Sequence, residues 1–186
     1  MKRLFMLMLG LALVGGTSHA SAHDGQGEPT RDERGAAGSA IDTHATAAGN
    51  RVEGSVIVRG TVAALKANLY HLDRWPSVFS DARSLKRNDD GTWSVDFRRF
   101  GHAHDFRITR TAAGLVFELA AKDHGSARLE YALEPIDANR SRLTIRLLVP
   151  TPPQVTTEQA IDMLRTKVQS DLDDFSKRAS AHSNGR

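Results

Sequence analysis

The chain has 186 residues, of which 40% are apolar and 25% are charged, and it contains no cysteine. This composition is typical of a globular protein, and the lack of cysteine excludes disulfide frameworks, thiol nucleophiles, iron–sulfur clusters and cysteine-based zinc sites. The formal net charge is +3 at pH 7, but Lys2 and Arg3 belong to a segment that we expect to be removed, and the other residues carry 23 basic and 22 acidic side chains. This even balance gives no electrostatic reason to expect a nucleic acid as partner.

The first residues have the pattern of a secretory signal peptide. Lys2 and Arg3 precede an apolar run from Leu4 to Val14, and the small residues Ala20-Ser21-Ala22 follow it. The run is shorter than the ~20 apolar residues that a membrane-spanning helix needs. The pattern predicts cleavage after Ala22, export to the periplasm or the exterior, and no integral membrane segment after cleavage. The alternative is a short uncleaved membrane anchor.

Residues 23–50 are rich in Gly, Ala, Thr and charged side chains, and Ile41 is their only large aliphatic residue. Such a segment cannot bury enough apolar surface to offset the entropy lost on ordering. We therefore expect residues 23–50 to be a flexible lead and residues 51–181 to form one domain. Residues 182–186 are expected to be a disordered tail.

The period of the apolar residues changes in an orderly way along the expected domain. Alternating valines predict a first strand over about residues 52–58, and Thr61 is placed to cap a short helix after it. Pro76 suits the start of a second short helix that ends near Phe79. Strand-like segments separated by turn signals follow around Leu85 and at 92–100, 103–111, 115–121, 126–134 and 142–149.

The C-terminal region predicts one long helix. Thr156 and Gln159 have the spacing of a capping box, and a stripe of apolar residues follows with helical spacing over about five or six turns: Ile161, Leu164, Val168, Leu172 and Phe175. Asp171, Asp173 and Asp174 are expected on the solvated face. The order of elements predicts an α+β helix-grip fold, in which a curved antiparallel sheet of about seven strands grips the C-terminal helix.

A hairpin is expected at Gly101-His102, with a two-residue turn that makes the numbers of facing residues sum to 203. This register places two charged pairs of opposite sign on the outer face of the sheet, Asp96 with Arg107 and Arg98 with Asp105. On the inner face it places Phe97 opposite Phe106, Trp93 opposite Arg110 and Arg99 opposite His104.

The inner-face charges have two interpretations, because an unpaired buried charge is costly. Arg99, His104 and Arg110 could simply lie at the margins of the sheet, with Arg110 stacked on Trp93. Alternatively, Arg99 and His104 form a polar anchor at the mouth of an apolar cavity.

The segment from Thr61 to Phe79 resembles the opening of the START-like (SRPBCC) superfamily, which includes polyketide cyclase-like, coenzyme Q-binding and lipid-transfer proteins. A short helix is followed by Asp73, then Trp75-Pro76 and a second short helix. The resemblance extends over residues 52–181 through the order of the elements, although the motif itself is short. It implies a deep apolar cavity between the sheet and the C-terminal helix. The residues expected to bind a ligand are Trp75, Phe79, Trp93, Phe97, Arg99, His104, Phe106, Phe117, Tyr131, Leu164 and Val168.

The first hypothesis for function is an exported carrier of a hydrophobic small molecule, such as a lipid, a quinone or a polyketide-like compound. Arg99 and His104 would hold the polar end of the ligand, and neither a cofactor nor a metal is expected. Transient contact with a membrane is compatible with this hypothesis. The alternatives are a cyclase- or hydratase-type enzyme with His104 as general base, and a protein-interaction module that uses the lead or an edge strand.

Overall fold

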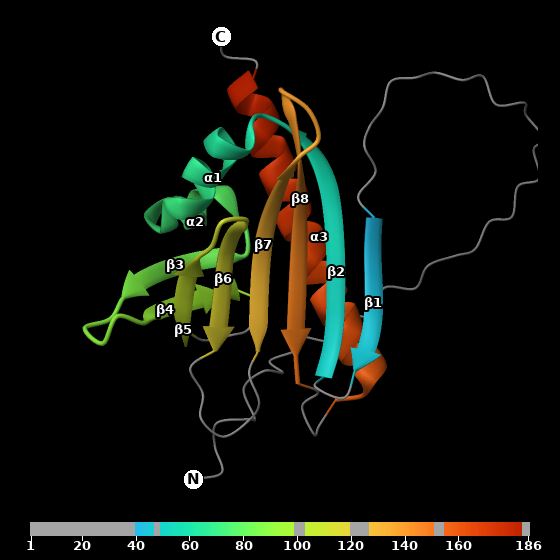
Figure 1. Cartoon of the computed structure of the whole chain (residues 1–186). Helices are drawn as coiled ribbons and strands as arrows, with labels where there is room; N and C mark the ends of the chain where they lie inside the picture. The colour runs from blue at the N-terminus through green and yellow to red at the C-terminus, as the bar shows by residue number, and fades with distance from the viewer. Residues whose placement is uncertain (1–39, 47–48, 99–102, 120–126, 151–154, 184–186) are drawn as a thin grey trace, which may run out of the picture.

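The computed structural model describes residues 40–46, 49–98, 103–119, 127–150 and 155–183. In these residues one eight-stranded sheet lies against a long C-terminal helix and two short helical segments (Figure 1). The elements, in chain order, are β1 (Ala40–Thr46), β2 (Gly49–Arg59), α1 (Val62–Tyr70), a 3-10 turn (Leu72–Arg74), α2 (Trp75–Val78), β3 (Ala82–Arg87), β4 (Trp93–Phe97), β5 (Ala103–Arg110), β6 (Gly114–Leu119), β7 (Arg128–Pro135), β8 (Arg140–Val149) and α3 (Thr157–Ser183).

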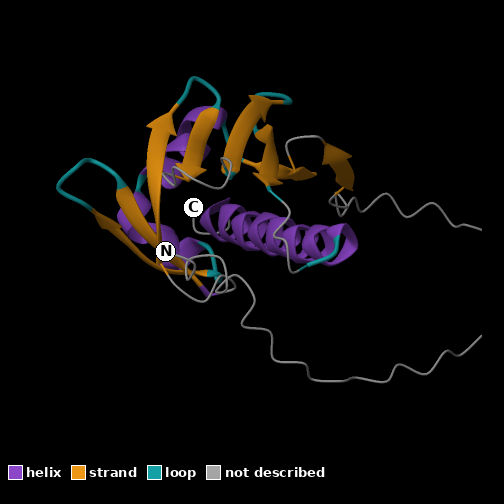
Figure 2. Cartoon of the chain, turned by 90° about the horizontal axis from the view of Figure 1, so that it is seen from below, coloured by secondary structure: helices purple, strands orange, loops and turns teal. Residues whose placement is uncertain are grey.

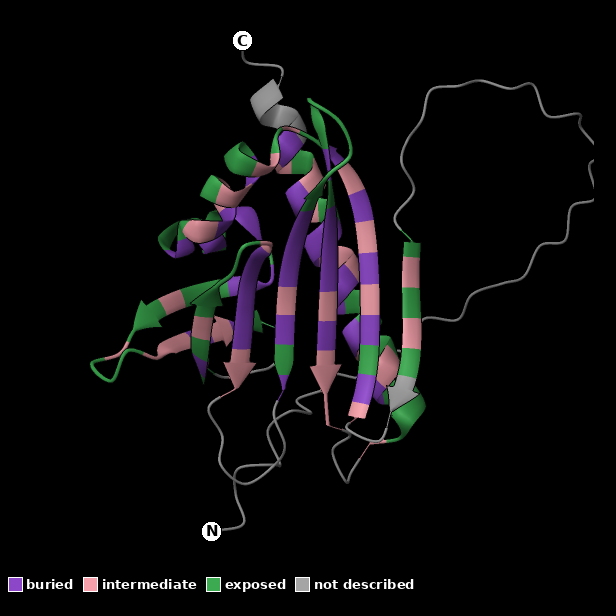
Figure 3. Cartoon of the chain, viewed as in Figure 1, coloured by how far each residue is buried: buried purple, intermediate pink, exposed green. Residues whose placement is uncertain are grey.

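All neighbouring strands are antiparallel, in the order β1-β2-β8-β7-β6-β5-β4-β3. The sheet is curved, and α3 lies across its open side (Figure 2). Buried residues gather in β6, β7 and β8, whereas β1 is largely exposed (Figure 3). This architecture confirms the predicted α+β helix-grip fold.

The first strand of the sheet differs from the sequence-based expectation. Strand β1 lies inside residues 23–50, for which we expected no regular structure, and pairs with β2 from Ala40↔Ser55 to Thr46↔Gly49. An edge strand is held by main-chain hydrogen bonds and therefore needs few apolar side chains. Among the β1 side chains that the structure describes, that of Ile41 packs against the core. The folded unit thus includes Ala40, and the sheet has eight strands instead of about seven.

The predicted helix starts are confirmed. The Thr61 side chain accepts a hydrogen bond from the amide of Ala64 at 3.3 Å, and α2 begins at Trp75 with Pro76 in its first turn. In the predicted capping box, the amide of Gln159 donates to Thr156 Oγ1 at 3.2 Å and the amide of Thr156 donates to Gln159 Oε1 at 3.1 Å. Helix α3 has 27 residues, so it is longer than predicted and continues past residue 181 to Ser183.

Helix α3 packs mainly across β2 and approaches it closely at Gly54. A Cβ atom added at Gly54 would lie 2.6 Å from Val168 Cγ1 and 2.9 Å from Leu172 Cδ1. The absence of a side chain at this position lets the apolar stripe of α3 rest directly on the strand. In the part of the chain that the structure describes, no helix is long and apolar enough to cross a bilayer.

The predicted register of the β4–β5 hairpin is wrong. The numbers of facing residues sum to 199, so that Trp93 faces Phe106 and Val95 faces His104. The two registers differ by an even number of residues, and such a shift leaves every side chain on its own face of the sheet. Alternation along the strands therefore could not distinguish them.

The charged pairs expected from that register are replaced by other contacts. Asp96 pairs with Arg83 at 3.4 Å, and the Asp105 carboxylate accepts a hydrogen bond from Asn88 Nδ2 at 3.1 Å. Arg98 Nε donates to the carbonyl of Ser80 at 3.0 Å. Arg107, expected opposite Asp96, faces Glu118 across β5–β6. The guanidinium of Arg110 lies over the ring of Tyr70 instead of that of Trp93.

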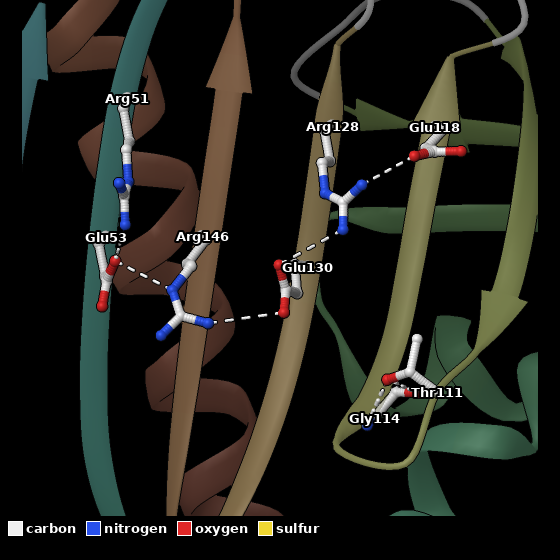
Figure 4. Close-up of polar contacts among 8 residues, drawn as sticks. All are labelled: Arg51, Glu53, Thr111, Gly114, Glu118, Arg128, Glu130 and Arg146. Carbon is white, nitrogen blue, oxygen red and sulfur yellow. Dashed lines mark hydrogen bonds and ion pairs between the residues drawn. The ribbon is translucent and has the colours of Figure 1, made fainter.

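The face of the sheet turned away from α3 carries a chain of ion pairs across β2, β8, β7 and β6 (Figure 4). Arg146 joins Glu53 at 3.0 Å and Glu130 at 3.5 Å, and Arg128 joins Glu130 at 3.8 Å and Glu118 at 2.8 Å. Partial burial raises the pKa of Glu53, but hydrogen bonds from Arg51 and Arg146 outweigh it and hold that pKa below its ordinary value. This face is polar, so the apolar surface of the sheet is the one facing α3.

Candidate functional site

Four of the predicted ligand-binding residues form a packed aromatic cluster between the sheet and α2. The Trp75 ring lies 4.5 Å from Phe79, 4.9 Å from Phe117 and 5.1 Å from Tyr131, measured between ring centroids. None of these four side chains is more than 1% exposed, and Trp75 Nε1 donates to the carbonyl of Leu69 at 2.9 Å. These residues are brought together as predicted, but their rings fill the space between them.

Three further predicted residues meet at the end of the sheet where β4 ends and β5 begins. The Phe97 and Phe106 ring centroids are 6.2 Å apart in an edge-to-face arrangement, and the His104 ring lies 6.4 Å from that of Phe106. They line a hollow of about 30 Å³ with side chains of β6, β7, β8 and the residue before β7: Leu119, Ala127, Arg128, Leu129, Leu147 and Val149. This volume is about that of one water molecule, whereas sites for small organic ligands measure roughly 300–1,000 Å³.

The other predicted residues are distributed around these two groups. Leu164 and Val168 are buried on the face of α3 that packs on the sheet, and Trp93 is half-buried opposite Phe106. Arg99 lies outside the described residues, and so does the proposed Arg99–His104 pair. The two aromatic groups adjoin through Phe106 and Phe117, whose ring centroids are 6.1 Å apart.

A second hollow lies at the opposite end of β7 and β8. This groove of about 990 Å³ is lined by the turns before α1 and before β8, with Ala179 of α3 on one side. It is far larger than the first hollow, and its lining is mixed, with Arg59, Asn68 and Arg140 beside Ala64, Leu65 and Ala179. Apolar ligands are favoured by apolar walls. The walls of the smaller hollow are more uniformly apolar, with Phe97, Phe106 and Leu129 among them, and we therefore treat it as the better candidate despite its size.

Sequence reasoning missed a cluster of buried charges next to the aromatic residues. Lys167 Nζ lies 2.7 and 2.6 Å from the two carboxylate oxygens of Asp171 and 3.5 Å from Asp81 Oδ2. Tyr131 Oη donates to Asp171 Oδ2 at 2.5 Å. The side chains of Lys167, Asp81 and Asp171 are 1%, 2% and 0% exposed. We call Lys167, Asp171, Asp81 and Tyr131 the buried polar cluster.

Burial dominates the protonation behaviour of this cluster. It raises the pKa of Asp171 above its ordinary value, although the charge and the hydrogen bonds of Lys167 oppose the increase. Burial, together with the neighbouring carboxylates of Asp171 and Asp81, raises the pKa of Tyr131 well above its ordinary value. Tyr131 is therefore a hydrogen-bond donor at neutral pH, and the cluster contains two carboxyl groups for one ammonium.

The helical spacing of the sequence indicates that Asp171 lies on the buried face of α3. Asp171 comes three residues after Val168 and four before Phe175, and both of these belong to the apolar stripe. Lys167 lies one turn before Asp171, at the spacing that lets the two side chains meet. The expectation that Asp171 is solvated was therefore wrong, because its position on the helix outweighed its polarity. Asp174 is also engaged, since it accepts a hydrogen bond from the amide of Ser80 at 2.7 Å.

No family model matches the sequence, and no curated protein matches it. Many solved structures match the fold at low sequence identity. A START superfamily protein from Mycobacterium smegmatis aligns with a TM-score of 0.61 and 13% identity, over 71% of this chain and 98% of that one. The Zhui aromatase/cyclase from Streptomyces sp. R1128 aligns with a TM-score of 0.55 and 15% identity, over 73% and 96%. A STAR-related lipid transfer protein from Xanthomonas axonopodis aligns with a TM-score of 0.56 and 11% identity, over 79% and 96%.

These alignments, together with the curved antiparallel sheet and the long C-terminal helix, show that the chain has the START-like (SRPBCC) helix-grip fold. The expectation drawn from Asp73 and Trp75-Pro76 is thereby confirmed at the level of the fold. Among the solved structures with this fold are a protein described as a lipid transfer protein and one described as an aromatase/cyclase.

Proposed function

We propose that this protein is an exported carrier that binds a hydrophobic small molecule between the sheet and α3. The observation that carries the proposal is the apolar hollow, where Phe97, Phe106 and side chains of β6, β7 and β8 converge on one point. His104 provides a polar group at its wall. Apolar walls with a small number of polar groups are the usual composition of a site for such ligands.

A hollow of about 30 Å³ cannot hold a lipid or a quinone without side-chain movement. Phe97 and Phe106 meet edge to face, and Phe106 adjoins the aromatic cluster through Phe117, so the carrier function requires at least one of these rings to move when a ligand binds. Binding then exchanges ring–ring contacts for ring–ligand contacts while it removes the apolar part of the ligand from water.

Two kinds of support come from outside the site. Proteins with this fold include one described as a lipid transfer protein, which agrees with a carrier function. The N-terminal pattern of Lys2-Arg3, an apolar run and Ala20-Ser21-Ala22 supports export and cleavage after Ala22.

The proposal is tested by filling the hollow. Ala127 lies in its wall and is 8% exposed, so Ala127→Trp places an indole where the ligand would lie. We expect this variant to bind Nile red, an uncharged apolar dye, at least about tenfold more weakly than the unmodified protein. Ala138→Trp, in the groove of about 990 Å³, serves as the matched control and leaves the affinity unchanged. Thermal unfolding of both variants verifies that they are folded.

If binding is lost in Ala138→Trp and retained in Ala127→Trp, the ligand binds in the groove instead of the smaller hollow. Failure of the unmodified protein to bind the dye would contradict the carrier function itself.

A further inference from the structure

We propose that the groove of about 990 Å³ beside α1 is a second binding site, and that Arg59 and Arg140 bind the phosphate group of a phosphorylated compound there. The groove lies at the end of the molecule where β2 ends and β8 begins, next to the last part of α3 (Figure 1). Its volume falls within the roughly 300–1,000 Å³ of sites for small organic ligands. The inference goes beyond the carrier function, because the groove and the apolar hollow share no lining residue.

Two arginines of the groove face each other on neighbouring strands. Arg59 is the last residue of β2, and it is paired with Arg140, the first residue of β8. Facing residues of an antiparallel pair project from the same side of the sheet, with Cα atoms about 4.5–5.5 Å apart. Like charges in this position destabilise the pairing of the strands. An anion bound by both guanidinium groups would replace their repulsion with two attractions.

The acidic side chains nearby balance only one of these arginines. Among the described residues that line the groove, Asp137 is the single acid, and its Oδ2 atom lies 2.6 Å from Arg140 Nε. The side chain of Arg59 makes no ion pair or hydrogen bond within the part of the chain that the structure describes. Beyond the lining, Arg142 faces Glu134 across β8 and β7, so these two charges offset each other. Two arginines and one aspartate leave the groove with one net positive charge.

The main chain that carries the two arginines is already fixed in the structure. The amide of Gly60 donates to the carbonyl of Asn139 at 2.7 Å, and Ser141 Oγ donates to the carbonyl of Gly60 at 2.8 Å. The Asp137 carboxylate accepts a hydrogen bond from the amide of Asn139 at 2.9 Å, which holds the turn before β8. Gly60 has a φ of 129°, in the region that favours glycine. The site therefore takes a ligand without rearrangement of the main chain.

Two neighbouring guanidinium groups favour a phosphate over a carboxylate. A phosphate monoester carries about 1.5 to 2 negative charges at pH 7 and has three terminal oxygens, enough to reach both groups. The two oxygens of a carboxylate match a single guanidinium. Ala64, Leu65 and Ala179 in the same lining suit a small apolar part of the compound. A free phosphorylated small molecule and the headgroup of an anionic phospholipid both offer this chemistry.

The experiment compares three probes that share a benzene ring: phenyl phosphate, benzoate and phenol. Each is titrated at neutral pH into the full-chain protein as its cells produce it, with binding followed by calorimetry. We expect phenyl phosphate to bind at least about tenfold more tightly than benzoate, because it bonds to a second charged group. We expect phenol to bind most weakly.

Arg59→Gln tests the site directly, because it removes the charge without an acidic partner and keeps a long polar side chain. We expect the affinity for phenyl phosphate to fall at least about tenfold. Arg87→Gln makes the same change at an exposed position of β3, outside the groove, and serves as the matched control with unchanged affinity. Since Arg59→Gln also removes the repulsion from Arg140, its unfolding temperature without ligand should equal or exceed that of the unmodified protein. A purely structural role of Arg59 would lower that temperature.

The two tryptophan variants separate the groove from the apolar hollow. Ala138→Trp places an indole in the groove, so it should weaken phenyl phosphate at least about tenfold and leave Nile red unaffected. Ala127→Trp should do the reverse.

Sedimentation with vesicles of phosphatidylcholine, with and without phosphatidic acid, identifies the source of the phosphate. Binding to the vesicles with phosphatidic acid that Arg59→Gln abolishes supports the inference and identifies a lipid headgroup. Binding of phenyl phosphate without binding to these vesicles supports it and identifies a free phosphorylated compound.

Benzoate binding as tight as that of phenyl phosphate, or equal losses in Arg59→Gln and Arg87→Gln, would overturn the inference while the carrier function stands. So would vesicle binding that Arg59→Gln leaves unchanged, or no binding to either phenyl phosphate or the vesicles with phosphatidic acid. Failure to bind Nile red would contradict the carrier function and leave this inference standing.

Discussion

Lys167 Nζ lies 2.6 Å from Asp171 Oδ2, one turn further along α3, and the two side chains are 1% and 0% exposed. Their pairing ties the helix to Tyr131 on β7 through Asp171 and to Asp81, just before β3, through Lys167. The helix and the sheet are therefore joined by charged groups inside a largely apolar interior. We expect the stability of the fold to depend on these groups remaining paired.

Lys167→Met tests this dependence. It leaves Asp171 and Asp81 buried without their ammonium partner, and removing one partner of a buried pair costs about 3–5 kcal/mol. We expect the free energy of unfolding, measured in urea, to fall by that amount. Lys177→Met, at an exposed position on the same helix, should change it by less than about 0.5 kcal/mol. Equal losses in the two variants would contradict the account.

Tyr131→Phe tests the phenol of the cluster through its pH dependence. The pKa of Tyr131 is raised well above 10.0 in the folded protein, so the unfolded chain loses this proton first as the pH increases. The folded state then holds more protons than the unfolded state, and the free energy of unfolding decreases as the pH rises above about 10. We expect a shallower decrease in Tyr131→Phe when urea unfolding is measured between pH 8 and pH 11. If the free energies of unfolding of the two proteins fall in parallel over this pH range, Tyr131 does not contribute to the pH dependence of stability.

Gly54→Ala tests the close approach of α3 to β2. The new Cβ would lie 2.6 Å from Val168 Cγ1, so the helix or the strand must shift. Overpacking of this kind costs about 1–3 kcal/mol. We expect thermal unfolding to show a loss in that range, and we expect Gly54→Ala combined with Val168→Ala to lose less than the sum of the two single variants. Strict additivity would mean that the two residues do not contact each other.

Two N-terminal truncations test where the folded unit begins. A chain that starts at Ala40 keeps the whole of β1 and its pairing with β2, whereas a chain that starts at Gly49 loses both, together with the contact of Ile41 with the core. We expect the first to unfold at the same temperature as the protein cleaved after Ala22, and the second to unfold more than about 4 °C lower. Identical unfolding temperatures would show that β1 adds nothing to the stability of the sheet.

The order of the elements from β2 onward was predictable because each of them carries its own local signal. Thr61, Pro76 and the Thr156–Gln159 capping box mark helix starts, and apolar residues alternate along the strands. Strand β1 has no such signal, because an edge strand depends on the main chain of its neighbour. The β4–β5 register could not be predicted either, because a shift by an even number of residues leaves the alternation of inner and outer side chains unchanged.

The candidate site was predictable in part. Alternation along the strands identified Phe117 and Tyr131, the resemblance to the START-like superfamily implied Trp75, and the three rings do lie together. Their close packing depends on ring orientations, which no spacing rule gives. The partner of Lys167 at the next turn could be inferred, but Asp81 comes from a distant part of the chain and joins the cluster only through the fold.

The central claim is that the protein carries a hydrophobic ligand, and native mass spectrometry tests it most directly. The full chain is expressed, purified without detergent from the exported fraction, and weighed before and after solvent extraction. The account predicts a polypeptide beginning at His23 with one molecule of an apolar compound that is lost on extraction. A protein that carries no such molecule and does not take up Nile red would contradict the claim.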